Sequence, residues 1–159
     1  PATRRENDYS TIHKINKHMH PTLRYILAIV LGVIAGMAIN MGIILISGHI
    51  IPPPAGADLT TEAGIKAAMP LMEPKHFLMP FLAHALGTLV AAFLAGLIAN
   101  RARKRVAMFP GVLFFIGGAA AVSMIPAPMW FNVTDLVCAY IPMAWLGYWL
   151  STQVIAEAV

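Results

Sequence analysis

The chain has 159 residues, of which 58% are hydrophobic and only 11% are charged. Soluble domains are usually about 45–50% apolar and about 25% charged, so this composition excludes an ordinary soluble globular protein. The formal net charge is +4, and the single cysteine, Cys138, excludes an internal disulfide and a multi-cysteine metal site.

Four stretches lack Asp, Glu, Lys and Arg, and each reaches the ~20 apolar residues that a helix needs to cross a bilayer. The predicted class is therefore all-α, an integral membrane four-helix bundle formed by one domain at 25–156. A polar, basic arm at 1–24 precedes it. The predicted spans are 25–48, 77–99, 107–126 and 135–156, with an outer loop at 49–76 and a cytoplasmic loop at 100–106.

Basic residues are divided unequally between the two sides of these spans. Nine Lys and Arg residues precede the first span or lie between the second and third, whereas two lie in the 49–76 loop. The positive-inside rule then places both termini in the cytoplasm and makes the 49–76 loop external. The predicted location is the bacterial inner (cytoplasmic) membrane, with the mitochondrial inner membrane as the alternative.

A basic cluster is expected to anchor the cytoplasmic loop to anionic lipid. No aromatic residue is interleaved with it, so a nucleic-acid partner is not expected. The cluster consists of Arg101, Arg103, Lys104 and Arg105.

Small residues recur every four positions on the first two spans. Such faces let helices approach closely, which in lipid is the main route to tight packing. They are predicted either to pack on each other or to contact another protein. The packing residues are Gly32 and Gly36 on the first span, and Gly87, Ala91 and Ala95 on the second.

Prolines predict the local structure of the outer loop and a bend in the fourth span. The run Pro52 to Pro54 predicts an extended spacer, after which Thr60 is expected to cap a short amphipathic helix reaching about Ala68. Pro142 is expected to bend the fourth span, because a proline cannot donate a hydrogen bond to the Cys138 carbonyl.

Several polar residues fall within the outer halves of the predicted spans. At about 1.5 Å rise per residue, Asn40 and His84 both lie roughly 10–12 Å below the outer helix ends. Three interpretations stay open: neutral side chains bonding across packed helices, a site for a ligand or metal, or a path for protons or ions. The predicted polar layer is Asn40, His84, Thr88, Ser123 and Tyr140, and the predicted outer mouth is His49, Glu73, His76 and Asp135.

Signals for catalysis and cofactors are weak. The sequence has no Gly-rich phosphate loop, no HExxH and no CxxC, so no enzyme, no catalytic residue and no cofactor are predicted. An enzyme acting on lipid or quinone would rest only on His76, His84 and Asp135. A copper site would rest on Met69, Met72 and Met79, but methionine is also a common gap-filler in apolar packing. No metal site is therefore predicted, and the expected bound molecules are lipids.

Two segments resemble a known group. The runs IPPPAGADLT (51–60) and EPKHFLMPFLAHALGTLVAAFLAG (73–96) are similar to small four-span inner-membrane proteins of bacteria that are labelled uncharacterised. IPAPMWF (125–131) and AYIPMAWLG (139–147) are similar to the same group, so the likeness covers most of 25–150. It implies the four-helix topology and no particular activity.

The leading functional hypothesis is a non-catalytic integral subunit or accessory protein that packs on other membrane subunits of a larger complex. Its basis is the absence of catalytic motifs together with two small-residue faces. The alternative is a small binding or transport protein that uses the polar layer around His84 for a ligand, a metal or protons.

Overall fold

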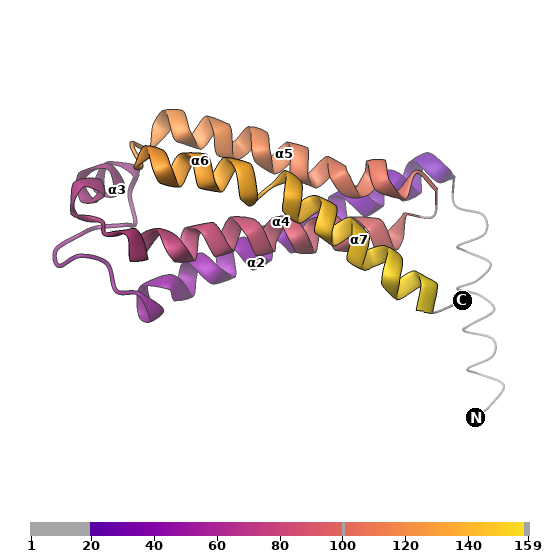
Figure 1. Ribbon diagram of the computed structural model, residues 1–159, viewed down its shortest axis with the longest axis horizontal. Coiled ribbons are helices and arrows are strands. Elements are labelled where there is room, and N and C mark those ends of the chain that lie inside the picture. The colour runs from indigo at the N-terminus through magenta and orange to yellow at the C-terminus, as the bar shows by residue number, and fades with distance from the viewer. Residues whose placement is uncertain (1–19, 100, 158–159) are drawn as a thin grey trace, which may run out of the picture.

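The computed structural model describes residues 20–99 and 101–157, so the predicted arm lies outside the described part up to residue 19 (Figure 1). The described residues form helices and no strand, which confirms the all-α class. The elements are α2 (Pro21–Ile50), α3 (Glu62–Ala68), η1 (Met69–Leu71), η2 (Pro74–Phe77), α4 (Leu78–Ile98), α5 (Arg103–Met124), α6 (Met129–Cys138) and α7 (Ile141–Glu157).

Four helical segments are long and apolar enough to cross a membrane, which confirms that part of the prediction. The first begins at Pro21, where a proline costs nothing because the first helical N–H groups have no partner within the helix. The ring nitrogen Nδ1 of His20 accepts a hydrogen bond from the Thr22 N–H at 3.3 Å and caps this end. The segments are Pro21–Ile50, Pro74–Ile98, Arg103–Met124 and Met129–Glu157.

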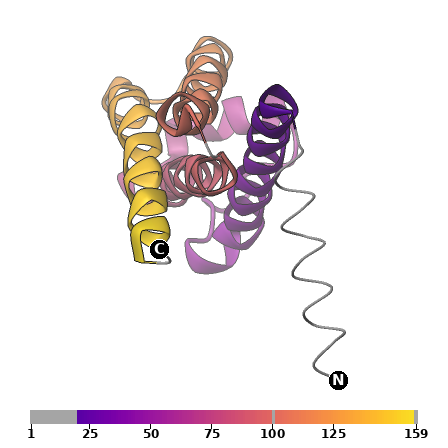
Figure 2. The ribbon, with the colours of Figure 1, turned by 90° about the vertical axis from the view of Figure 1, so that its right-hand side faces the viewer.

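Helix α4 is the centre of the bundle. It contacts α2, α5, α6 and α7, and Figure 2 shows its end surrounded by the other long helices. Ala83, Ala91, Ala92 and Ala95 on α4 are all completely buried. These side chains leave room for backbones to approach from several sides, so α4 connects all the other long helices.

The two small-residue faces lie against each other. A Cβ atom added to Gly32 would lie 2.5 Å from the carbonyl oxygen of Ala91, and one added to Gly36 would lie 2.5 Å from that of Gly87. No side chain fits at these distances, because the neighbouring atom belongs to a helix backbone. The structure therefore uses both faces within the chain, in the contact between α2 and α4.

The fourth spanning segment consists of two helices that meet at an angle (Figure 1). It begins at Met129, after the extended Pro128, and so starts six residues before the expected position. The helical bonds stop at Ala139, whose N–H donates to the Asp135 carbonyl at 2.9 Å, and resume where the Ala144 N–H donates to the Tyr140 carbonyl. Pro142 has no N–H to continue the ladder between them.

The outer loop contains the short helix α3. Thr61 caps it, one residue later than expected, by accepting a hydrogen bond from the Gly64 N–H at 3.0 Å. Before the cap, Asp58 accepts hydrogen bonds from the Thr60 hydroxyl at 2.6 Å and from its N–H at 2.8 Å. The pKa of Asp58 is below its ordinary value, mainly because the Thr60 hydroxyl donates to the carboxylate and secondly because the Thr60 N–H does so.

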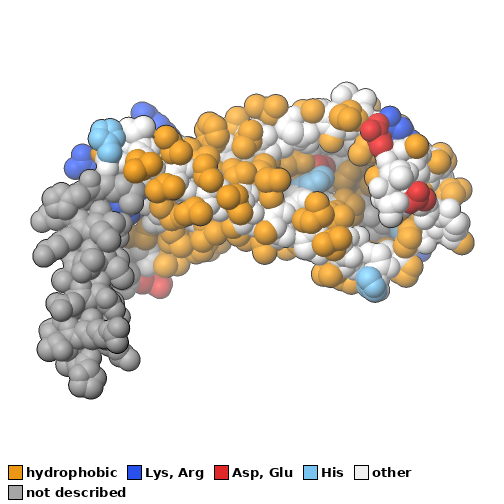
Figure 3. All heavy atoms as spheres, turned by 180° about the vertical axis from the view of Figure 1, so that it is seen from behind, with side chains coloured by type: hydrophobic (Ala, Val, Ile, Leu, Met, Phe, Trp, Pro, Cys, Tyr) orange, Lys and Arg blue, Asp and Glu red, His pale blue; other side chains and the backbone are white. Residues whose placement is uncertain are grey.

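The long helices expose many large apolar side chains. Leu23, Ile34 and Leu45 on α2 are half exposed or more, and Figure 3 shows that hydrophobic side chains cover most of one side of the bundle. Contiguous apolar surface of this extent is typical of a protein that faces lipid.

Candidate functional site

His84 of α4 and Asp135 of α6 form a pair across two helices. The Nδ1 atom of His84 lies 2.9 Å and 3.0 Å from the two carboxyl oxygens of Asp135. Asp135 is 5% exposed, whereas the His84 side chain is 32% exposed. At a 1.5 Å rise per residue, Asp135 lies about 9 Å along its helical segment from Met129, and His84 lies about 10 Å along its own segment from Phe77. The pair is thus a buried acid attached to a histidine that reaches the surface.

Tyr140 completes the cluster from the break between α6 and α7. Its hydroxyl donates a hydrogen bond to Asp135 Oδ2 at 2.9 Å, and its ring stacks on the His84 ring with centroids 5.8 Å apart. Gly118 of α5 makes room for this hydroxyl, since a Cβ atom at that position would collide with it. The tyrosine therefore fixes both members of the pair.

Two residues of the predicted polar layer lie next to this cluster. Thr88 is fully buried one turn below His84, and its hydroxyl donates to the His84 carbonyl at 2.7 Å. Asn40 of α2 is half buried, and a Cβ atom on Gly87 would lie 3.2 Å from its Cβ atom. Gly87 and His84 are three residues apart and so adjacent on the surface of α4. Asn40 therefore lies against α4 within one turn of His84.

Ser123 lies apart from the other layer residues. It is exposed, and its hydroxyl donates to the Ala120 carbonyl of its own helix at 2.6 Å. It is next to the last residue of α5 and lies about 7.5 Å further along that helix than Gly118, which is level with the Tyr140 hydroxyl. The structure therefore joins His84, Tyr140 and Thr88 to Asp135, with Asn40 within one turn of His84 along α4.

The other predicted mouth residues lie near the helix ends that adjoin the 49–76 loop. His49 is exposed in the last turn of α2. His76 is half buried, with Nε2 3.2 Å from the Pro52 carbonyl and Nδ1 accepting from the Glu73 N–H at 2.9 Å. The pKa of Glu73 is lowered, mainly because Lys75 donates a hydrogen bond to its carboxylate and secondly because Lys75 is positively charged. His76 thus connects the 49–76 loop to η2, about 12 Å along the helical segment from His84.

Arginine side chains hold the opposite end of α4. The Nε atom of Arg24 donates to the Ile98 carbonyl at 2.6 Å, and that of Arg103 donates to the Ala99 carbonyl at 3.2 Å. They satisfy carbonyls at a helix C-terminus, where positive charge is also favourable. Lys104 and Arg105 are exposed beside them, as is Arg101. The predicted anchor residues therefore include one, Arg103, with a direct role in capping.

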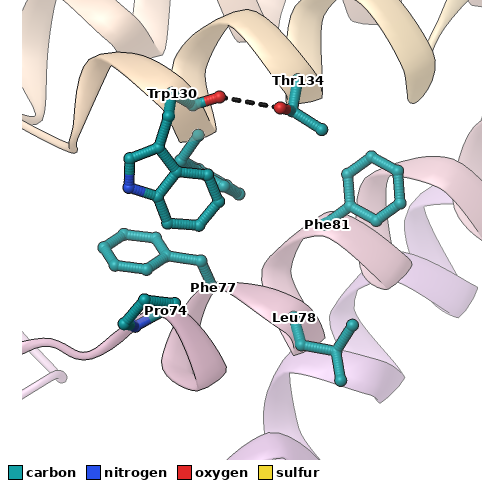
Figure 4. A pocket seen from close by; sticks show the side chains of 7 residues that line it. Pro74, Phe77, Leu78, Phe81, Trp130 and Thr134 are labelled. Carbon is teal, nitrogen blue, oxygen red and sulfur yellow. Dashed lines mark hydrogen bonds between the residues drawn. The ribbon is translucent and has the colours of Figure 1, made fainter.

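A separate groove opens between α4 and α6. It has a volume of about 290 Å³, and Figure 4 shows the aromatic rings that form its walls. The Phe77 ring packs edge-on to Trp130 with centroids 5.5 Å apart. The only hydroxyl in it belongs to Thr134 and donates to the Trp130 carbonyl. The lining residues are Pro74, Phe77, Leu78, Phe81, Trp130, Phe131 and Thr134.

No family model, curated protein or solved structure matches this chain. The chemistry of the site therefore has to be argued from its own atoms.

Metal binding has little support in the cluster. The described residues contain no group of three or more His, Cys, Asp or Glu side chains that could hold an ion. Of the methionines considered for copper, Met79 is buried, and Met69 and Met72 are half buried around η1. What the cluster provides is one oriented imidazole whose second nitrogen, Nε2, has no hydrogen-bond partner among the described residues.

Asp135 is the candidate site residue that lies deeper than the sequence predicted, at the level of His84 and not at the outer mouth. Spans were delimited as runs without charge, so an acidic residue necessarily fell at the edge of the fourth span. Pro128 was the available signal, because a helix that starts after it carries Asp135 nearly two turns deep. The helix then brings the carboxyl group to the level of His84.

Proposed function

We propose that this protein spans a membrane and binds a small ligand, taken up from the lipid, at His84. The observation that carries the proposal is the arrangement of the imidazole: Asp135 and Tyr140 hold the ring, while Nε2 has no hydrogen-bond partner in the described part of the chain. Every buried side-chain nitrogen or oxygen of the described residues has a hydrogen-bond partner. The unpaired Nε2 is therefore open to the surroundings, where a ligand can reach it.

The placement proposed for the chain follows its charges. Four apolar segments cross a bacterial inner membrane, or a mitochondrial one, with both termini and the Arg101 to Arg105 cluster in the cytoplasm. The span lengths and the exposed apolar side chains support this placement. In this orientation the His84 site opens into the outer half of the bilayer.

A binding site is better supported than a path for protons. Below Thr88, the described parts of α2, α4, α5 and α7 carry no Asp, Glu, His, Ser or Thr until Ser151 near the other end. Ser151 lies beside Gly96, which is eight residues and about 12 Å further along α4 than Thr88. A hydrogen bond spans about 3 Å, so Asp, Glu, His, Ser and Thr side chains do not connect Thr88 to Ser151, and among the described residues the hydroxyl between their levels belongs to Tyr148.

The accessory-subunit hypothesis stays a prediction, but its basis has changed. It rested on two small-residue faces, and both are used between α2 and α4. With these two faces occupied, the His84 cluster is the most specific feature that the described residues offer to another molecule.

The proposal is tested by the small molecules that co-purify with the full chain. Native mass spectrometry of protein in lipid nanodiscs is expected to show a discrete bound molecule in the wild type and to show at least tenfold less in H84L. A tenfold loss corresponds to about 1.4 kcal/mol, a modest value for removing a hydrogen bond to a ligand. H49L is the matched control, because His49 is exposed and lies far from the site. Equal ligand content in H84L and H49L would contradict the proposal.

A further inference from the structure

Two arginine side chains are fixed to the end of α4 that lies opposite the 49–76 loop. The Nε atom of Arg24, in the first turn of α2, donates to the Ile98 carbonyl at 2.6 Å. The Nε atom of Arg103, the first residue of α5, donates to the Ala99 carbonyl at 3.2 Å. The two acceptors belong to consecutive residues, whose Cα atoms are about 3.8 Å apart. The two guanidinium groups are therefore held at neighbouring points of one helix end.

The helices under these arginines are closely packed. Ala28 of α2, Ala95 of α4 and Val106 of α5 belong to one buried cluster, together with Ala99. Both arginines are themselves half buried. Packed helix backbones therefore set the position of each guanidinium group.

Most hydrogen-bond donors of the two groups are unused. A guanidinium group has five N–H donors, and each of these arginines uses the one on Nε, while Nη1 and Nη2 have no hydrogen-bond partner among the described residues. No carboxylate in the described part of the chain forms an ion pair with either arginine. The remaining donors are therefore available to an acceptor from outside the chain.

The positive charge at this end exceeds what the helix itself neutralises. A helix C-terminus carries a partial charge of about −0.5, whereas each guanidinium group carries a full positive charge. Lys104 and Arg105 are exposed beside them and add to it, and Figure 3 shows Lys and Arg side chains at the end of the bundle where the described part of α2 begins. This end of the bundle therefore attracts an anion.

The position of the two arginines favours an anion that is carried by a lipid. The apolar segment Pro74–Ile98 ends here and Pro21–Ile50 begins here, so in the proposed membrane the arginines lie near the boundary of the hydrocarbon core, at the level of lipid head groups. Ile26 and Leu27, next to Arg24 on α2, are exposed. Acyl chains therefore find apolar surface directly beside the charge.

We propose that Arg24 and Arg103 bind the phosphate group of an anionic phospholipid through their Nη atoms. Arginine suits this group because its planar fork of donors matches the geometry of phosphate oxygens. A soluble phosphate compound offers the same oxygens but no chains to lie on α2. The inference uses the membrane placement and does not depend on a ligand at His84.

Binding to the full chain in micelles is measured by native mass spectrometry with three probes. Dioleoyl phosphatidylglycerol carries an anionic phosphate and two chains, dioleoylglycerol carries the chains alone, and glycerol 3-phosphate carries the phosphate alone. The phospholipid is expected to bind about tenfold more tightly than either of the others, since hydrogen bonds to charged groups and apolar contacts both contribute. Equal binding of dioleoylglycerol would overturn the phosphate site. Equal binding of glycerol 3-phosphate would instead overturn the lipid source and identify a soluble phosphate compound as the ligand.

Substitutions separate a specific site from diffuse attraction. R103Q is expected to weaken phosphatidylglycerol binding by about tenfold or more, because it removes charged donors. The matched control K104Q removes an equal charge from an exposed neighbour and should weaken binding only about twofold, since exposed charges contribute little. If K104Q weakened binding as much as R103Q, the proposed site would be overturned.

A conservative substitution guards against a folding defect, because R103Q also loses the bond to the Ala99 carbonyl. R103K keeps the charge and can still cap a helix end, but it lacks the planar fork. It is therefore expected to fold and to bind the phospholipid severalfold more weakly, as is R24K. Wild-type affinity in both lysine variants would contradict the role of the arginines. H84L should bind the phospholipid normally, so this inference and the His84 proposal fail separately.

Discussion

The contact between α2 and α4 is tested by adding one methyl group at Gly36. In G36A the new Cβ would lie 2.5 Å from the Gly87 carbonyl oxygen and 2.7 Å from the Ala91 Cβ atom. Overpacking costs about 1–3 kcal/mol, and both neighbouring atoms are fixed to the α4 backbone, which favours the upper part of that range. The higher helix propensity of alanine offsets about 0.8–1 kcal/mol. The expected net loss is about 1–2 kcal/mol.

The same helix provides the matched control. A Cβ atom on Gly42 would meet nothing within 4 Å, so G42A gains the propensity term alone and is expected to be stabilised by up to about 1 kcal/mol. Reversible unfolding of both proteins in mixed micelles, followed by circular dichroism, measures the difference of roughly 2–3 kcal/mol. If G36A were as stable as G42A, the close packing of these two helices would be refuted.

Two further substitutions test the cluster and the outer loop. G118A introduces a Cβ atom that collides with the Tyr140 hydroxyl, so this substitution is expected to lower ligand content severalfold. In the neighbouring control G117A the new Cβ atom meets nothing within 4 Å, and ligand content should be unchanged. Equal ligand content in both variants would contradict the role of the tyrosine. The Thr60 bonds lower the pKa of Asp58, so their stabilising effect is complete above the ordinary value near 3.8 and is lost as the pH falls through the lower folded value. T60V should therefore bring the acid loosening of this loop to higher pH, as measured by hydrogen exchange of its amides, and an unchanged pH profile would exclude the bond as the cause.

Much of the fold was predictable because its causes are local. A run such as Phe77 to Ala99 is long enough and apolar enough to indicate a spanning helix by itself. The four-residue spacing of Gly32 and Gly36 likewise identifies a packing face. The sequence could not determine whether that face meets another part of the chain or another protein, because the spacing is the same in both cases.

For most residues of the candidate site the half of the bundle was predictable, but the direction of the side chain was not. Counting residues along each span placed His84 and Ser123 in the same half of the bundle, yet Ser123 faces outward. The direction of a side chain depends on how each helix is rotated against its neighbours, and the weak amphipathicity of apolar helices gives little indication of this. The depth of Asp135 was predicted wrongly for a different reason, because it depends on where the fourth segment begins and where its helix breaks.

The most direct test of the binding proposal is an experimental map of the full chain in lipid, at a resolution that shows side chains and bound molecules. The account predicts a non-protein molecule beside His84, with a polar atom at hydrogen-bond distance, about 2.7–3.2 Å, from Nε2. A map in which another side chain of the protein bonds to Nε2, or in which no molecule is bound there, would contradict it.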